Sequence, residues 1–156
     1  IVLRNTSATA GFFLYWMLFS IYTKQMARQK LLIRIIVLML LLFTADFLTK
    51  KFFWYNSIWY FDMIMHFLSS FWVGLFFIYI FTLKESFSKL ISHVILSVLF
   101  IGISWEIFEF IVNNVIGRIP FNSLDTLSDI FWDLVGGYIS VFYFLKRIMS
   151  IKQNTI

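Results

Sequence analysis

Acidic and imidazole side chains recur at helical spacing in three apolar stretches of this sequence. The residues concerned are Asp62 and His66, Glu106 and Glu109, and the series Asp125, Asp129 and Asp133. Residues three or four positions apart share one face of a helix. An ionisable side chain inside a bilayer costs about 2.5–3.5 kcal/mol even on a mild scale, so such groups face the protein interior. The sequence therefore predicts three acidic helix faces that converge in one layer.

A layer of six carboxylates predicts either bound protons or bound cations. Arg118 and a protonated His66 could offset only two of the negative charges. Oxygen ligands with one imidazole suit Mg²⁺, Mn²⁺, Ca²⁺ or Zn²⁺, and the sequence has no Cys to offer a thiolate. We therefore predict a divalent metal ion as cofactor. Its predicted ligands are Asp62, His66, Glu106, Glu109, Asp129 and Asp133.

Some of these residues also have plainer interpretations. An Asp–His pair at i, i+4 often only stabilises a helix, and Glu109 fits an acid that reaches the solvent from a helix end. Asp125 fits the N-cap of the last helix, whereas acids in the second and third turns cannot be caps. For catalysis we single out the residues that lie deeper or can carry a proton, which are His66, Glu106 and Asp133.

Two basic positions complete the charge pattern. Arg118 is the only base between the two most acidic helices, and we predict that it binds a substrate phosphate. Asp46 precedes Lys50 by four residues, which predicts a local ion pair on a helix surface.

The composition is that of a protein whose solvent is largely lipid. Of its 156 residues, 61% are apolar and 22% aromatic, and the mean hydropathy is +0.87. The net charge of +5 does not indicate nucleic acid, because the bases stand in short runs that flank apolar stretches, as membrane anchors do. We therefore predict an all-α polytopic transmembrane helix bundle that forms a single domain over residues 1–156.

About 20 helical residues cross a bilayer, and five stretches approach that length. They are residues 8–22, 31–48, 63–83, 90–112 and 127–145. We expect the first stretch to be retained rather than cleaved as a signal, because no small-residue cleavage site follows it. Residues 52–61 are rich in Trp and Tyr, which predicts a segment at headgroup level.

The distribution of basic residues predicts the direction of the chain. Nine of the thirteen Lys and Arg residues fall on one side of the five-span arrangement. The positive-inside rule then puts the N-terminus outside and the C-terminus in the cytoplasm. The acidic layer then lies near the outer face.

The order of these motifs resembles that of the VanZ-like and YjdF-type bacterial inner-membrane proteins. Those families have an Asp-x3-His-Phe start to one helix, an acidic helix after it, and an Asp-rich entry to a Gly-containing last helix; the similarity covers about residues 60–138. Asp133 stands where VanZ-like proteins tend to have Asn, which is closer to the YjdF type. The resemblance implies a bacterial inner-membrane location and, for VanZ itself, an association with glycopeptide-antibiotic resistance, but no reaction.

Three functions remain open at this point. The first is a metal-dependent membrane hydrolase or phosphotransferase that acts on lipid or lipid-linked phosphate. The second is a non-catalytic membrane module with a structural cation, and the third is an ion-coupled transporter. The expected partners are membrane lipids and a lipid-linked substrate, and we expect no nucleic acid; oligomerisation is compatible with each.

Overall fold

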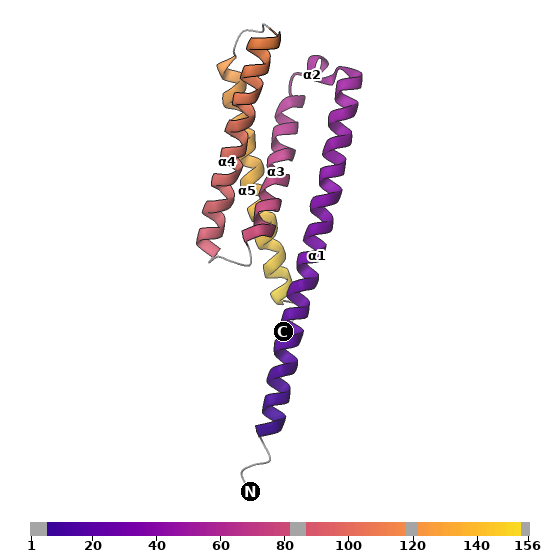
Figure 1. Ribbon diagram of the computed structural model, residues 1–156, viewed down its shortest axis with the longest axis vertical. Helices are drawn as coiled ribbons and strands as arrows, with labels where there is room; N and C mark the ends of the chain where they lie inside the picture. Colours follow the sequence, from indigo (N-terminus) through magenta and orange to yellow (C-terminus); the bar gives the residue numbers. More distant parts are fainter. Residues whose placement is uncertain (1–5, 82–86, 118–121, 154–156) are drawn as a thin grey trace. The chain divides into compact units, whose positions relative to one another are not determined.

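The protein is helical throughout the residues that its computed structural model describes. These are residues 6–81, 87–117 and 122–153, with side chains described between 25 and 146 except at 27, 55, 56, 87 and 115. No strand occurs within these ranges. The elements are α1 (Thr6–Phe52), α2 (Trp54–Ser57), α3 (Phe61–Phe81), α4 (Phe87–Ile111), the π-helical η1 (Val112–Gly117) and α5 (Ser123–Gln153) (Figure 1).

Helix α1 joins two of the predicted spans into one element. Its helical backbone continues through residues 23–30, where the five-span arrangement expects the chain to turn. No Gly or Pro occurs in that stretch to end the helix. The chain divides into two compact units inside α1, residues 1–34 and 35–156. The expectation of one domain over residues 1–156 stays a prediction.

The backbone of Phe53 ends α1 and begins the short helix α2. Phe53 has φ of 55° and ψ of 34°, in the left-handed region, which costs a residue with a side chain roughly 1–2 kcal/mol. Trp54 stacks on Phe52 and meets Phe61 edge to face, with ring centroids 5.8 Å apart in both pairs. The aromatic stretch predicted from residues 52–61 is therefore a bend that leads into α3.

Helix α3 packs against both α4 and α5, and small residues allow the close approach. A Cβ built on Gly136 would collide with the backbone of Phe67 and Phe71 in α3. A Cβ on Gly137 would lie 3.1 Å from a methyl group of Val98 in α4. Two adjacent glycines of α5 thus bring it close to both neighbouring helices.

Apolar side chains fill the interior of this bundle and also cover its outside. Leu75, Ile78, Val94 and Val98 are buried, at 2% exposure or less, whereas Phe100 is 71% exposed. An exposed apolar surface of this kind is suited to lipid. Among the described residues, three helical stretches are long and apolar enough to cross a membrane: Arg28–Phe52, Phe61–Phe81 and Ser88–Asn114.

These three stretches contain the predicted spans 31–48 and 90–112 and nearly all of 63–83. The predicted span 127–145 lies inside α5 but is not among them, because Asp129 and Asp133 lower its hydropathy. Helix α5 begins at Ser123, so the expected N-cap Asp125 lies instead in its first turn. The N-cap position is therefore Asn122, and that expectation was wrong by three residues.

Candidate metal centre

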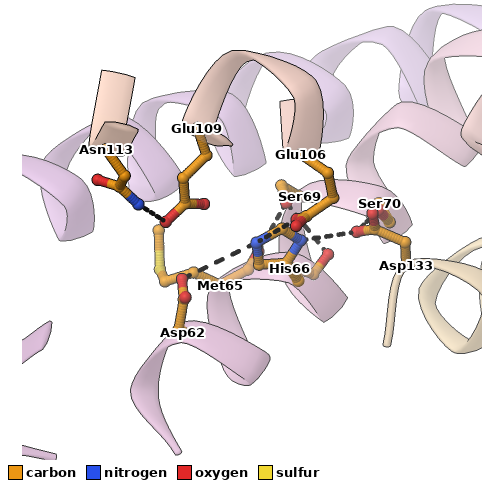
Figure 2. Close-up of polar contacts among 9 residues, drawn as sticks. All are labelled: Asp62, Met65, His66, Ser69, Ser70, Glu106, Glu109, Asn113 and Asp133. Atoms are coloured by element: carbon orange, nitrogen blue, oxygen red, sulfur yellow. Dashed lines mark hydrogen bonds and ion pairs between the residues drawn. The ribbon is translucent and has the colours of Figure 1, made fainter. Parts of the chain in front are cut away.

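The imidazole of His66 lies at the centre of the acidic layer. His66 is on the second turn of α3 and is 6% exposed. Its Nε2 lies 3.9 Å from Asp62 Oδ1 and 3.7 Å from Glu106 Oε1, and its Nδ1 lies 3.2 Å from Asp133 Oδ1. Figure 2 shows Asp62 and Asp133 on opposite sides of the ring, with Glu106 approaching from α4. Side chains from α3, α4 and α5 therefore meet at one histidine.

Asp133 receives two contacts on the same oxygen. Besides facing His66, its Oδ1 accepts a hydrogen bond of 2.5 Å from the hydroxyl of Ser70, one turn further along α3. Asp133 is 2% exposed, and a Cβ built on Gly102 of α4 would collide with its Oδ2. Asp133 thus fits between α3 and α4 only because position 102 has no side chain.

Three carboxylate oxygens in this layer are buried without a hydrogen-bond donor among the described residues. They are Glu106 Oε1, Asp129 Oδ1 and Asp133 Oδ2. The three residues are between 2% and 8% exposed. Buried carboxylates are normally paired, because removing such a charge from water without compensation is very costly. These oxygens therefore require a proton or a cation close by.

Two groups of ligand atoms are compact enough to hold a metal ion. Asp62, His66 and Asp129 each offer one atom within 4.8 Å of the others, and so do His66, Glu106 and Glu109. Both groups contain His66, and every member is at least partly buried. Each group thus combines the imidazole of His66 with two carboxylates, donors that are typical of Mn²⁺, Mg²⁺, Ca²⁺ or Zn²⁺.

Neighbouring polar groups hold the two glutamates of α4. The Asn113 amide donates to Glu109 Oε1 at 3.3 Å from the π-helical turn η1 (Figure 2). Thr126 of α5 lies near Glu106. Turns of π-helix often occur at functional sites. Polar groups from η1 and from α5 therefore lie beside the two glutamates at the end of α4.

The structure brings together nearly all of the predicted site residues that it describes. Asp62, Glu106, Glu109 and Asp129 gather around His66 as potential ligands. Asp133 also lies in the cluster, but it faces Nδ1 and is in neither group of ligand atoms. Arg118, the predicted phosphate-binding residue, lies outside the described residues.

Sequence reasoning missed Ser70 at this site. A usable signal was present, because Ser70 follows His66 by four residues and so lies on the same face of α3. The adjacent Ser69 does not contact Asp133; among the described residues its hydroxyl bonds to the α3 backbone, at 2.7 Å to Met65 O and 3.1 Å to His66 O. Choosing between the two serines requires the position of α5.

The fold and the cluster define a helical membrane protein with a buried acidic centre between three helices. The chain belongs to the family described as Predicted membrane protein (DUF2238), which matches residues 3–149. An uncharacterized protein of Thermotoga maritima is 29% identical over 141 residues, 83% of this chain and 72% of that protein. No solved structure matches the chain. The prediction of a membrane-protein family is confirmed, while neither match points to VanZ-like proteins in particular.

Proposed function

We propose that this protein binds a divalent cation between α3, α4 and α5 and uses it to act on the phosphate of a lipid or lipid-linked substrate. One observation carries the proposal. His66 belongs to two groups of potential ligand atoms, one with Asp62 and Asp129 and one with Glu106 and Glu109, and both Glu106 and Asp129 keep a buried oxygen without a hydrogen-bond donor among the described residues. A cation bound beside His66 would compensate buried negative charge of this kind.

The ligands in this proposal are chosen by geometry. His66 and the carboxylates of Glu106 and Asp129 form its inner set, because they are the buried members of the two groups. Asp62 and Glu109 are partly exposed and complete the set on the solvent side. Such a donor set matches hard or borderline divalent ions.

The chemistry proposed for the site is hydrolysis or transfer of a phosphoryl group. A bound metal ion polarises a phosphoryl oxygen or activates water. Asp62 and Glu109 lie at the exposed edge of the cluster, where a substrate enters, and the aromatic stretch 52–61 offers a surface for acyl or prenyl chains. In this proposal Arg118 holds the phosphate. The ring of His66 is the candidate acid or base.

A structural cation is the second candidate. The proposed ligands come from three separate helices, so an ion among them would tie the bundle together whether or not it reacts. The two candidates differ in what a ligand change does. In an enzyme, Glu106→Gln abolishes turnover while the protein still folds, whereas in a structural module the same change lowers the melting temperature and there is no turnover to lose. The ion-coupled transporter ranks third, because the candidate acids cluster at one end of the helices.

The proposal is tested first by metal analysis. We expect detergent-purified protein to retain a stoichiometric divalent ion and, after chelation, to rebind Mn²⁺ or Zn²⁺ in calorimetry. Glu106→Gln should lose this binding, and Asp46→Asn, which changes an exposed acid, should keep it. Phosphate release from lipid phosphates then tests the reaction. Wild-type protein that binds no divalent ion would refute the proposal.

Topology belongs to the same proposal. We propose five spans, with the N-terminus outside and the C-terminus in the cytoplasm of a bacterial inner membrane, in a protein related to the VanZ-like and YjdF-type families. The chain has no Cys, so a single cysteine can be introduced in place of Gln29, Ser57, Ser88 or Asn122. Each variant is then treated in whole cells with a thiol reagent that does not cross the membrane. Labelling at positions 57 and 122 alone supports the arrangement. Labelling at position 29 contradicts the five-span arrangement. A helix that remains unbroken through residues 23–30 in the membrane would also contradict it.

A further inference from the structure

The two nitrogens of His66 have different surroundings. Nδ1 lies 3.2 Å from Asp133 Oδ1, within hydrogen-bonding distance. Nε2 lies 3.7 Å from Glu106 and 3.9 Å from Asp62, too far for a hydrogen bond to either. The ring is therefore held at one edge and open at the other.

Asp133 is itself held in place. Ser70 donates to the oxygen that faces His66, so α3 supplies both the ring and the donor that fixes the ring's partner. Gly102 of α4 leaves room for the other oxygen, and Asp133 is 2% exposed. A side chain confined in this way cannot readily swing toward the ligand atoms on the Nε2 side.

We propose that Asp133 is a positioning residue rather than a metal ligand. Its carboxylate accepts the proton of Nδ1, which leaves the lone pair of Nε2 directed at the carboxylates of Asp62 and Glu106. A metal-binding histidine generally donates its second ring nitrogen to a carboxylate or carbonyl, which fixes the tautomer and the orientation of the ring. The part of this inference that concerns metal affinity rests on the proposed function, whereas the tautomer does not.

The tautomer is tested in metal-free protein. With ¹⁵N-labelled histidine in detergent, at the alkaline end of a pH series where the ring is neutral, the couplings show which nitrogen carries the proton. The chain has two histidines, and the exposed His93 serves as an internal reference. We expect His66 to carry its proton on Nδ1, and Asp133→Asn and Ser70→Ala to shift protons toward Nε2, the Ser70 change less. A proton on Nε2 in the wild type would overturn the inference even if both variants fail to fold.

Metal titration of the same proteins tests the consequence. We expect Asp133→Asn to bind Zn²⁺ roughly 10- to 100-fold more weakly, the usual effect of removing such an outer partner, and Ser70→Ala to lie in between. Ser140→Ala is the matched control, because the hydroxyl of this buried serine bonds to Gly137 O of its own helix and contacts no group of the acidic layer among the described hydrogen bonds. Unchanged affinity and tautomer in Asp133→Asn would refute the positioning role while metal binding stands. A shifted tautomer with no metal binding in the wild type would refute the proposed function alone.

Discussion

Two acid–base pairs in this protein share one spacing and differ in nearly everything else. Asp46 and Lys50 lie four residues apart on α1, with Lys50 Nζ 2.8 Å from Asp46 Oδ2 and both side chains exposed. Asp62 and His66 are also four apart, on α3, but their closest atoms are 3.9 Å apart and His66 is buried. The first pair is closed, meaning that its two groups are in direct contact, and the second is open, meaning that its two groups are too far apart for a hydrogen bond.

The difference lies in what the rest of the fold brings to each pair. Asp46 and Lys50 satisfy each other, and the predicted ion pair is confirmed. His66 instead faces carboxylates from α4 and α5, so negative charge exceeds what one imidazole can offset. An open pair inside an excess of like charge is a place for a ligand, whereas a closed surface pair has only a small effect on stability.

Among the substitutions that test this difference, we expect Asp129→Asn to have the largest effect. We expect the variant to bind Mn²⁺ or Zn²⁺ at least ~100-fold more weakly, because it loses a buried charged ligand. Metal at 100 times the wild-type dissociation constant stabilises the wild type by about 2.7 kcal/mol, and the variant would gain about 0.4 kcal/mol at most. Thermal unfolding in detergent with and without metal measures both.

The metal-free proteins supply the control for that experiment. Without a cation, Asn at position 129 relieves repulsion among buried carboxylates, so the variant should unfold at the same temperature as the wild type or above it. A metal-free variant that unfolds well below the wild type would show that Asp129 stabilises the fold by some other contact.

We expect the second-largest effect from a substitution at the close contact between α5 and the backbone of α3. Gly136→Ala places a methyl group against the main chain of Phe67 and Phe71, which cannot move aside as a side chain can. We expect a loss of about 2 kcal/mol in the free energy of unfolding, with weaker metal binding because α5 shifts. Gly137→Ala is the matched control, since the three atoms nearest to its methyl group belong to the side chain of Val98, at 3.1–3.3 Å. Equal effects of the two changes would contradict the close α3–α5 contact.

Glu109→Gln sharpens the comparison within the site itself. Glu109 is only partly buried and is already held by Asn113, so its charge should count for less than that of Asp129. We expect about a tenfold loss of metal affinity, equivalent to about 1.4 kcal/mol. Calorimetry with the metal-free variant measures it. A loss as large as that of Asp129→Asn would mean that the ion lies on the α4 side of His66.

Asp46→Asn should have the smallest effect. Breaking an exposed pair at i, i+4 costs about 0.3–0.5 kcal/mol and less at high salt. Metal affinity should not change. Chemical unfolding at low and high ionic strength measures the first expectation, and calorimetry the second. Any drop in metal affinity would show that the two pairs are coupled.

The helices were largely predictable from composition and spacing. Apolar stretches mark α3 and α4 within a few residues at each end, because lipid leaves a chain few alternatives to a helix. The turn that the five-span arrangement expects at residues 23–30 is absent from α1, where no Gly or Pro ends the helix. In the site, i+4 spacing identified His66 and Asp133, yet the pattern alone could not show which ring nitrogen faces Asp133.

The amino-acid sequence by itself determined that this is a lipid-facing helical protein and that its buried acids share helix faces, because burial cost and helical repeat are local properties. Only the tertiary structure decided which acids meet. The glycines at 136 and 137 set how closely α5 approaches its neighbours, and that approach directs Asp133 to Nδ1 of His66 and leaves Nε2 to the remaining carboxylates. Distances of this kind depend on the packing of three helices and are not encoded in the spacing along any one of them.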